Sequence, residues 1–466
     1  MQLQGKKVVV MGLGVHGGGL GVARYCAEQG AQVIVTDLRT ADVLRDSIAA
    51  LADLPITYVL GEHREKDFEN CDILVQNPAV PASSPYVRLA RKAGAAIEME
   101  MTLFFRLCPA PIIAVTGSKG KTTTATLTAH LLKSWRTDTI LAGNMRISAL
   151  AQLPLIGLQT LVVLELSSFV LEGLGAAGLS PAVAAITNIH PDHLDRYGTM
   201  EVYIAAKAEI GRHQQPTDTL ILNALDTNLT ALAPAMQGQL VWTSSAELSD
   251  PIPGSVWWAG DVLWVSLATG TVAVAHATDI LLGGVHNRAN IATAVALALQ
   301  AGMPHTRIAA ALRTFTGVEH RQEIVATLDG HTFVNDTAAT MPDAAIAALT
   351  SLPQPIIWIA GGADKKLSFE SLATIAATQV SHIILLQGTA TALLREALER
   401  HGAADRIVGT YDSFEDGIRA AHSLALRPAT IALSPGCASF GMFRNEFHRG
   451  EEFRRIVQLI IAEVGA

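Results

Sequence analysis

A glycine- and lysine-rich segment at residues 116–124 has the side chains best suited to bind phosphate. It reads Thr-Gly-Ser-Lys-Gly-Lys-Thr-Thr-Thr and follows the apolar run Ile112–Val115. A strand, a glycine-rich loop and a helix in this order are typical of a phosphate-binding loop, whose backbone N–H groups surround the phosphates. Lys121 could then reach the terminal phosphates, and Thr122 could bind Mg²⁺. The two glycines lie closer together than in the common P-loop, so we predict a shortened variant that binds ATP; the alternative is a surface turn.

Three other polar residues could act beside these phosphates. Glu165 ends the apolar run Leu161–Leu164, and a carboxylate at a strand end next to a P-loop can hold Mg²⁺; a helix cap is the alternative. His193 and Lys207 belong to a later segment that is rich in groups able to bind metal. A lysine cation repels Mg²⁺, so Lys207 could bind a metal only when neutral or converted to an anionic carbamate.

Asparagine amides and glycines mark two further candidate nucleotide contacts. Asn287 and Asn290 are three residues apart in a helical segment, so their amides share one face and suit an adenine edge; helix capping by Asn287 is the alternative. Near the N-terminus, the segment Gly12–Gly17 follows a short apolar run, and Asp37 lies where an acidic residue can bind a ribose hydroxyl. A tight turn without a ligand would also explain these glycines.

Four polar segments in the last third of the chain complete the candidate site residues. Each lies at or just beyond a predicted strand, and ligands of open α/β sheets bind at the carboxyl ends of strands. One such segment would be an ordinary capped turn, but four together favour a contribution to a site. The segments are Glu319–Arg321, Asn335–Thr340, Gly361–Lys365 and Ser434–Phe440.

Short apolar runs that alternate with alanine- and leucine-rich segments must position these residues. Continuous apolar runs are typical of parallel strands with both faces buried, and their alternation with helices indicates βαβ units in an α/β fold. The predicted strands are Lys7–Met11, Gln32–Thr36, Ile73–Val75, Ile112–Val115, Leu161–Leu164, Ala182–Thr187, Thr219–Leu222, Ile356–Ala360, His382–Leu386 and Thr430–Leu433. The predicted helices include Gly21–Gln29, Thr122–Lys133, Ala289–Ala301, Ala344–Leu349 and Glu415–Leu424.

A chain of 466 residues is too long for one ordinary domain. Prolines at two seams, Leu107–Pro111 and Ala301–Pro304, restrict the chain and suit domain junctions. The segment Val241–Ala277 alternates apolar and polar residues and is rich in tryptophan, so we predict a small antiparallel sheet inside the middle domain. The three predicted domains are residues 1–108, 109–301 and 302–466.

The composition narrows the class of protein. Half of the residues are hydrophobic and 16% are charged, which excludes global disorder. With a formal net charge of −8, the chain lacks the basic surplus of a general nucleic-acid binder. Its four cysteines are far apart, which excludes a disulfide framework and a zinc knuckle. No run approaches the ~18 apolar residues of a membrane helix, and no secretory signal is recognisable, so we expect a cytoplasmic protein without membrane insertion.

Taken together, the motifs resemble those of the Mur ligases, and the resemblance spans essentially the whole chain in the family's motif order. The motifs are Thr116–Thr122, Leu164–Phe169, Asp192–Tyr197 with Lys207, His286–Asn290 and Asn335–Thr337. The N-terminal glycine-rich segment, Asp37–Arg39, Ser434–Ser439 and Arg449-Gly450 are most similar to members that add glutamate to UDP-N-acetylmuramoyl-L-alanine. The resemblance implies an N-terminal Rossmann-like domain for the UDP-sugar, a central P-loop ATPase-type domain, and a C-terminal Rossmann-like domain for the amino acid.

The resemblance also implies a reaction. ATP phosphorylates the substrate carboxylate to an acyl phosphate, the amine of D-glutamate attacks it, and phosphate leaves, as a step of peptidoglycan precursor synthesis. Such chemistry depends on charge neutralisation and positioning more than on covalent help from the protein. Two Mg²⁺ ions, a carbamylated Lys207 and a monomeric state are implied as well.

Site residues follow from the matching positions of the resemblance. The implied catalytic residues are Lys121, His193 and Lys207, and the implied metal ligands are Thr122, Glu165, His193 and Lys207. The implied ATP contacts are Thr116, Gly117, Ser118, Lys119, Gly120, Lys121, Thr122, Thr123, Asn287, Asn290, Arg321 and Asp336. The implied contacts to UDP-N-acetylmuramoyl-L-alanine are His16, Asp37, Arg39, Asn144 and Ser167, and those to glutamate are Thr340, Lys365, Ser439 and Phe440.

Three departures from the family pattern bear on which substrate is used. Ala338 stands where a lysine is common, Val170 replaces a glutamine, and Glu446-Phe447 replaces Phe-Glu. All three affect amino-acid or sugar recognition, so L-glutamate and another Mur-superfamily ligase activity stay open as alternatives. A nicotinamide-dependent oxidoreductase would leave Lys121 and His193 unexplained, and a non-catalytic nucleotide-binding protein would not need them.

Overall fold

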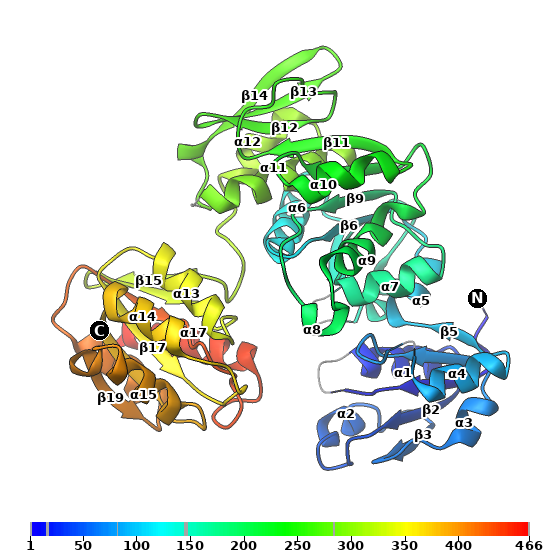
Figure 1. Ribbon diagram of the computed structural model, residues 1–466, viewed down its shortest axis with the longest axis horizontal. Helices are drawn as coiled ribbons and strands as arrows, with labels where there is room; N and C mark the ends of the chain where they lie inside the picture. Colours follow the sequence, from blue (N-terminus) through cyan, green and yellow to red (C-terminus); the bar gives the residue numbers. More distant parts are fainter. Residues whose placement is uncertain (1, 15–17, 82, 144–147, 283–284, 465–466) are drawn as a thin grey trace. The chain divides into compact units, whose positions relative to one another are not determined.

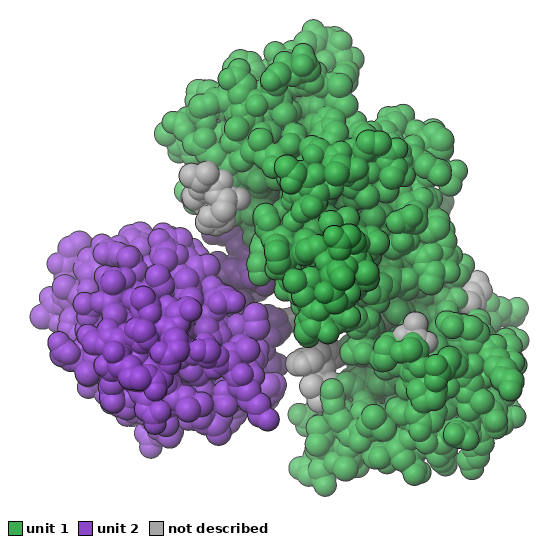
Figure 2. All heavy atoms as spheres, in the orientation of Figure 1, with its two compact units in different colours: residues 1–315 green, residues 316–466 purple. Residues whose placement is uncertain are grey.

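The computed structural model describes residues 2–14, 18–81, 83–143, 148–282 and 285–464. The chain divides into two compact units, Met1–Phe315 and Thr316–Ala466, which Figure 2 colours separately. The first unit holds two β-sheets and the second holds one (Figure 1). Within the described ranges, every helix is too short or too polar to cross a lipid bilayer.

The first sheet is parallel and has the strand order β3-β2-β1-β4-β5, which is the Rossmann arrangement. Helix α1 covers one face of this sheet, and α3 and α4 cover the other. The strands are β1 (Lys7–Met11), β2 (Gln32–Asp37), β3 (Ile56–Leu60), β4 (Ile73–Gln76) and β5 (Ala96–Glu98). The helices are α1 (Gly18–Glu28), α2 (Arg45–Ala49), α3 (Glu65–Glu69) and α4 (Pro85–Lys92).

The central sheet has nine strands in the order β14-β13-β12-β11-β10-β9-β6-β8-β7. Its strands are β6 (Ile112–Thr116), β7 (Thr139–Gly143), β8 (Leu161–Glu165), β9 (Val183–Ile186), β10 (Thr219–Asn223), β11 (Gln239–Ser244), β12 (Val256–Ala259), β13 (Val262–Leu267) and β14 (Gly270–His276). The α-helices are α6 (Lys121–Trp135), α7 (Ser168–Ala176), α8 (Leu194–Tyr197), α9 (Met200–Arg212), α10 (Thr227–Leu232), α11 (Val285–Gln300) and α12 (Ile308–Leu312). Short 3-10 helices are η1 (Leu150–Leu155), η2 (Ala233–Ala235), η3 (Ala277–Asp279) and η4 (His305–Arg307).

The predicted antiparallel strands of the middle domain are present, but they continue the central sheet. β11 pairs in parallel with β10 and, at its end, with β12, while β12, β13 and β14 pair antiparallel. The free edge of β11 offers unpaired backbone groups, which β12 satisfies. No separate small sheet is seen among the described residues.

The sheet of the second unit has the order β15-β16-β20-β17-β18-β19, parallel except for β15. Side chains of β17 alternate between two buried clusters, Ile356 and Trp358 on the side of α13–α15 and Ile357 and Ile359 on the side of α16 and α17. The strands are β15 (Glu323–Leu328), β16 (His331–Asn335), β17 (Ile356–Gly361), β18 (Val380–Leu386), β19 (Ile407–Tyr411) and β20 (Ala429–Leu433). The helices are α13 (Pro342–Ser351), α14 (Glu370–Gln379), α15 (Thr391–Arg400), η5 (Ala404–Arg406), α16 (Phe414–Ser423) and α17 (Glu446–Val464).

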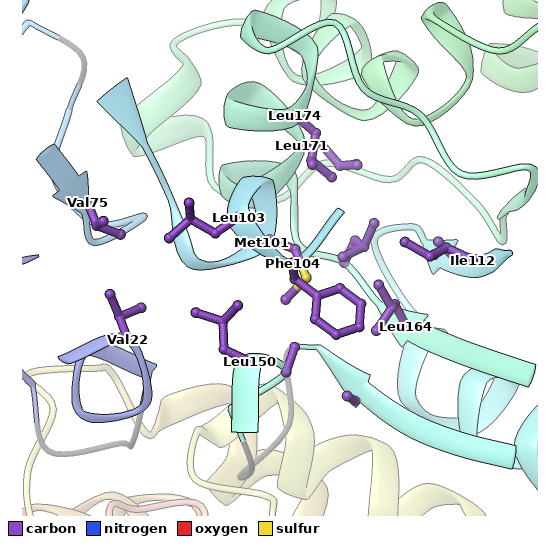
Figure 3. Close-up of a cluster of buried hydrophobic side chains, with 14 of the residues drawn as sticks. Val22, Val75, Met101, Leu103, Phe104, Ile112, Leu150, Leu164, Leu171 and Leu174 are labelled. Carbon is purple, nitrogen blue, oxygen red and sulfur yellow. The ribbon is translucent and has the colours of Figure 1, made fainter. Parts of the chain in front are cut away.

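One hydrophobic core runs from the first sheet to the central sheet through α5 (Glu100–Leu107). Leu103 and Phe104 of this helix are fully buried. They belong to the same cluster as Val75 of the first sheet and Leu164 of the central sheet (Figure 3). Because α5 contributes to both packing regions, residues 1–315 form one compact unit. The predicted division at residue 108 stays a prediction.

Candidate active site

The predicted P-loop follows β6 at the carboxyl edge of the central sheet, and α6 begins directly after it at Lys121. Glycine is required at both ends of the loop because Gly117 and Gly120 have φ values of 149° and 81°. A Cβ atom at Gly117 would lie 1.9 Å from Thr187 Oγ1, and one at Gly120 would lie 2.1 Å from Asn290 Oδ1. The side chains of Thr187 and Asn290 therefore pack directly against the backbone of the two glycines, which leaves no room for another residue at either position.

Two lysine amines meet at this loop. Lys121 Nζ donates to Gly117 O at 2.9 Å and to Ser118 O at 3.0 Å, and Lys207 Nζ donates to the same Gly117 O at 2.8 Å. Lys121 and Lys207 are far apart in the sequence, and the shared carbonyl of Gly117 brings their amines to the same loop. The arrangement concentrates positive charge where phosphate oxygens would bind.

The environment of Lys207 makes its neutral form accessible near neutral pH. Burial and, to a smaller extent, the nearby charge of Lys121 lower the pKa of Lys207 to about 7, although Asp192 acts in the opposite direction. The side chain is 1% exposed, and its amine lies 4.7 Å from the centre of the Tyr203 ring. A neutral amine is the form that can react with CO₂ to give a carbamate.

The two other predicted metal ligands lie on neighbouring segments. Glu165 ends β8 beside Val115 of β6 and is buried. His193 precedes α8 with φ 52°, and its ring lies 6.4 Å from the Tyr203 ring that also contacts Lys207. His193 and Lys207 therefore neighbour the same tyrosine ring, and their roles as metal ligands stay a prediction.

The hydroxyl groups of the first loop residues form structural hydrogen bonds. Thr116 Oγ1 donates to Leu166 O at 2.8 Å, which links β6 to the end of β8. Ser118 Oγ donates to His190 O at 2.9 Å and lies 3.1 Å from Tyr203 Oη. Lys119 is exposed and is held through its backbone, since its N–H donates to Asn188 Oδ1 at 2.9 Å. Thr122 and Thr123 are half-buried in the first turn of α6.

These residues fit Mg²⁺ bound together with a nucleotide better than a metal held by protein alone. Mg²⁺ is usually bound by one or two protein oxygens, phosphate oxygens and water. Thr122 and Glu165 could supply such oxygens, because Thr122 lies in the first turn of α6 and Glu165 ends β8, which pairs with β6. No group of three His, Cys, Asp or Glu side chains that could hold a metal ion occurs in the described ranges.

The predicted asparagine pair lies against the P-loop. Asn290 Nδ2 donates to Asn287 Oδ1 at 3.0 Å, so the two amides share one face of α11 as expected. Asn290 Oδ1 accepts from Thr124 Oγ1 of α6 at 3.4 Å. Both asparagines are buried, and their predicted contact with adenosine stays a prediction.

Of the predicted UDP-sugar residues, two lie outside the described residues, namely His16 and Asn144. Asp37 is buried and accepts from Gly14 N–H at 3.1 Å and from Arg39 N–H at 2.9 Å, so it fixes the glycine-rich turn. Arg39 is exposed beside it, and Ser167 caps α7 by accepting from Val170 N–H at 3.4 Å.

In the second unit, the predicted glutamate residues lie at the carboxyl edge of its sheet. Lys365 Nζ donates to Thr340 Oγ1 at 2.9 Å, and burial lowers the pKa of Lys365. The hydroxyl of Ser439 is buried and has no hydrogen-bond partner among the described residues. Phe440 beside it is 53% exposed. A buried hydroxyl without a protein partner is suited to accept a hydrogen bond from, or donate one to, a small polar ligand.

The two predicted ATP contacts of this unit differ in environment. Asp336 is buried and accepts from Ser434 Oγ at 2.6 Å and Gln322 N–H at 3.1 Å, and burial raises its pKa to about 7. Arg321 is exposed and directly precedes Gln322.

Two supporting residues were not predicted as site residues. Tyr203 lies one helical turn before Lys207, a spacing that could have identified it. Arg449 is 1% exposed, and its guanidinium donates to Thr337 Oγ1 at 2.9 Å and Thr337 O at 3.0 Å. It also reaches Cys437 O at 3.4 Å. Arg449 therefore joins the loops after β16 and β20, a contact between distant segments that spacing cannot predict.

Three family models match the chain in order. They are the Mur ligase MurD-like N-terminal domain over residues 6–98, the Mur ligase middle domain over residues 115–298, and the Mur ligase glutamate ligase domain over residues 320–437.

Curated relatives match over almost the full length. The UDP-N-acetylmuramoylalanine--D-glutamate ligase of Roseiflexus sp. (strain RS-1) is 54% identical over 98% of this chain and 99% of its own. The enzyme of the same name from Symbiobacterium thermophilum is 37% identical over 98% of both chains.

Solved structures have the same fold. The UDP-N-acetylmuramate-alanine ligase of Thermotoga maritima gives a TM-score of 0.60 at 19% identity, covering 97% of this chain and 99% of its own. The MurF ligase of Thermotoga maritima, solved with ADP, gives a TM-score of 0.53 at 17% identity, covering 98% of this chain and 95% of its own. With the full-length relatives and the three domain matches, these findings establish that the chain belongs to the Mur ligase family.

Proposed function

We propose that the protein is an ATP-dependent ligase that joins D-glutamate to UDP-N-acetylmuramoyl-L-alanine in peptidoglycan precursor synthesis. The observation that carries the proposal is 54% identity over nearly the whole chain to a UDP-N-acetylmuramoylalanine--D-glutamate ligase. The amine of Lys121 on the P-loop supports it, because acyl phosphate chemistry needs positive charge around the transferred phosphoryl group.

The reaction has two chemical steps. A carboxylate oxygen of the alanyl group attacks the γ-phosphorus of ATP, which releases ADP and forms an acyl phosphate. The glutamate amine then attacks the acyl carbon, loses a proton, and displaces inorganic phosphate from a tetrahedral intermediate. Bringing the carboxylate and ATP together in line accounts for much of the rate in such reactions.

Residues of the first unit bind the phosphates and metal in this proposal. Lys121 and the N–H groups of the loop hold the β- and γ-phosphates, and Thr122 and Glu165 hold one Mg²⁺. His193 and a carbamylated Lys207 hold a second Mg²⁺. When bound, the metal ions neutralise charge that develops on the transferring phosphoryl group.

Carbamylation of Lys207 removes a conflict in this arrangement. An ammonium group there would repel both Lys121 and a metal ion, whereas a carbamate carries negative charge and oxygen ligands. The pKa of about 7 supports this step, because a substantial fraction of the amine is then neutral at neutral pH.

The remaining roles are assigned by position in the family motifs. Adenosine contacts are Asn287, Asn290, Arg321 and Asp336, and further loop contacts are Thr116, Ser118, Lys119 and Thr123. UDP-sugar contacts are His16, Asp37, Arg39, Asn144 and Ser167, and glutamate contacts are Thr340, Lys365, Ser439 and Phe440. We assign these to three domains, residues 1–108, 109–301 and 302–466, of a cytoplasmic monomer.

Ala338 favours one alternative, the same reaction with L-glutamate. Without a lysine there, Lys365 is the cation that contacts Thr340 in this part of the second unit. A single cation constrains the two carboxylates of glutamate less than two cations would. The configuration of the amino acid therefore needs a direct test.

The test measures phosphate release from ATP with UDP-N-acetylmuramoyl-L-alanine and either D- or L-glutamate. The proposal predicts release that requires both substrates and is fastest with D-glutamate. Release only with L-glutamate would retain the ligase class and change the substrate. No release with either amino acid would refute the proposed function.

A further inference from the structure

The guanidinium group of Arg196 makes two contacts beside the candidate metal ligands. Arg196 lies in α8, three residues after His193. Its Nη2 donates to Glu172 Oε2 at 2.8 Å, and its Cζ lies 4.3 Å from the centre of the Phe169 ring. At that distance a guanidinium stacks on an aromatic ring and is attracted by its π-electrons. Both the charge and the planar face of Arg196 therefore hold it to α7.

The ring of Phe169 also contacts His193. The two ring centroids lie 5.1 Å apart, with their planes inclined by 58°, and the other neighbouring ring, Tyr203, is farther away at 6.4 Å. The side chain of His193 is 47% exposed and its φ is 52°. A residue with a Cβ atom stays in this conformation only where its surroundings hold it. The imidazole Nε2 lies 3.9 Å from Asp192 Oδ1, and Phe169 is the closer of the two neighbouring aromatic rings.

We propose that Arg196 is a positioning residue for the imidazole of His193 and acts through the ring of Phe169. Glu172 fixes the guanidinium, the guanidinium fixes the Phe169 ring, and that ring limits the orientations of His193. The inference rests on the proposed function, in which His193 binds a metal ion. Residues that orient a metal ligand affect metal affinity without touching the metal.

Arginine is specifically suited to this role. A lysine at position 196 would retain a charge for Glu172, but its ammonium has no planar face to stack on Phe169. The replacement of Arg196 by lysine therefore separates stacking from ion pairing. A third contact, from Arg196 Nη1 to Pro78 O, is longer at 3.5 Å and adds little.

The experiment compares the full-length wild-type protein with Arg196→Gln, Arg196→Lys, Phe169→Leu and the double variant Phe169→Leu/Arg196→Gln. Mn²⁺ binding is followed by electron paramagnetic resonance in the presence of a non-hydrolysable ATP analogue, and the midpoint of thermal unfolding is measured in parallel. The matched control is Arg212→Gln, because Arg212 forms a comparable ion pair with Glu209 at 2.7 Å in α9.

Arg196→Gln, Arg196→Lys and Phe169→Leu should each weaken Mn²⁺ binding about tenfold. The double variant should bind Mn²⁺ with the same affinity as whichever of its two single variants binds Mn²⁺ less tightly. Both changes break the same series of contacts, so the second change adds no further loss. Arg212→Gln should bind Mn²⁺ as the wild type does.

Three results would overturn the inference: wild-type affinity in Arg196→Gln or Arg196→Lys, additive losses in the double variant, or an equal loss in the control. A wild-type protein that binds no Mn²⁺ would also overturn it. Failure of the proposed function is a separate result, because it would be seen as no phosphate release by the wild-type protein. In that case the Mn²⁺ affinities of the variants still test the role of Arg196.

Discussion

At the scale of single residues, one backbone oxygen organises the candidate phosphate site. Gly117 O accepts from both Lys121 and Lys207, at 2.9 and 2.8 Å. Two ammonium groups on one acceptor repel each other, which is one cause of the lowered pKa of Lys207. The two lysines consequently differ in what they can do: Lys121 supplies charge, and Lys207 can supply a neutral amine.

Replacement of Lys121 by alanine should reduce turnover at least about 100-fold, because a charge aimed at the transferred phosphoryl group is lost. The fold should be retained, since the Lys121 side chain donates to carbonyl groups of its own loop and is half-buried at the start of α6. Steady-state phosphate release and the thermal unfolding midpoint measure the two effects. Lys133→Ala, an exposed lysine in the last turn of the same helix, is the control. Near-normal turnover in Lys121→Ala would contradict the phosphate-loop assignment.

Activity should depend on dissolved CO₂ because the carbamate forms from the neutral amine of Lys207. With a pKa of about 7, this amine is mostly protonated below pH 7 and mostly neutral above it. Enzyme kept in CO₂-free buffer should lose turnover, and added bicarbonate should restore it, more fully at pH 8 than at pH 6. Turnover that is independent of bicarbonate at both pH values would argue against carbamylation.

Sequence predicted the residues that act through local spacing and missed those that act through contacts between segments. Lys121, Glu165 and the pair Asn287 and Asn290 could be found because each has a fixed offset from a strand or helix end. The hydrogen bonds of Arg449 could not, because their partner Thr337 is 112 residues away. Such contacts form only when distant segments pack together in the folded chain, so the spacing of residues along the sequence does not indicate them.

At the scale of helices and strands, burial on both faces made the central strands predictable. All ten predicted strands are present, since each lies inside a sheet and is mostly apolar. β3 and β19 were not predicted because they are edge strands with alternating burial, and β5 because it has only three residues. The antiparallel pair β15 and β16 was likewise not predicted, because polar residues interrupt the apolar runs of both strands.

A pair of histidines, the buried His331 and the half-buried His422, links β16 to α16 in the second unit. His331 Nδ1 lies 3.0 Å from His422 Nδ1, and His331 Nε2 lies 2.9 Å from Leu426 O. The carbonyl requires a proton on His331 Nε2, so in neutral rings His422 Nδ1–H donates to His331 Nδ1. Protonation of His331 Nδ1 would replace this acceptor by an N–H group that faces the N–H group of His422.

The pair should make folding sensitive to acid. Burial lowers the pKa of both histidines; Arg427 lowers them further and Asp329 opposes this. As the pH falls below the ordinary value of 6.5, the unfolded chain binds protons that the folded chain does not, so the free energy of unfolding decreases. Urea unfolding at several pH values should show a smaller acid-side loss in His422→Asn than in the wild type. An unchanged pH dependence would contradict this reading, and His276→Asn, at an exposed position, is the control.

At the scale of the whole molecule, the two units have separate hydrophobic cores. Phe104 is fully buried in the core that joins the first two sheets, and Phe453 is fully buried in the core of the second unit. Each phenylalanine therefore stabilises one unit. Proline-marked seams in the sequence predicted domain junctions, but they could not predict that α5 would join two sheets through one core.

Truncation of either phenylalanine should destabilise its own unit only. Phe104→Ala and Phe453→Ala should each cost about 3–5 kcal/mol, which is typical of a large-to-small change in a packed core. Differential scanning calorimetry should show two transitions, of which Phe104→Ala lowers one and Phe453→Ala lowers the other. A single transition shifted by both variants would contradict the independence of the two units.

The central claim is that the protein makes an amide bond through an acyl phosphate. The most direct measurement uses UDP-N-acetylmuramoyl-L-alanine labelled with ¹⁸O in the alanyl carboxylate, and mass spectrometry of the phosphate released with ATP and D-glutamate. The account predicts that each phosphate carries one oxygen from the labelled carboxylate, because that oxygen bonds to phosphorus before the amine displaces it. Release of phosphate without ¹⁸O would contradict the account.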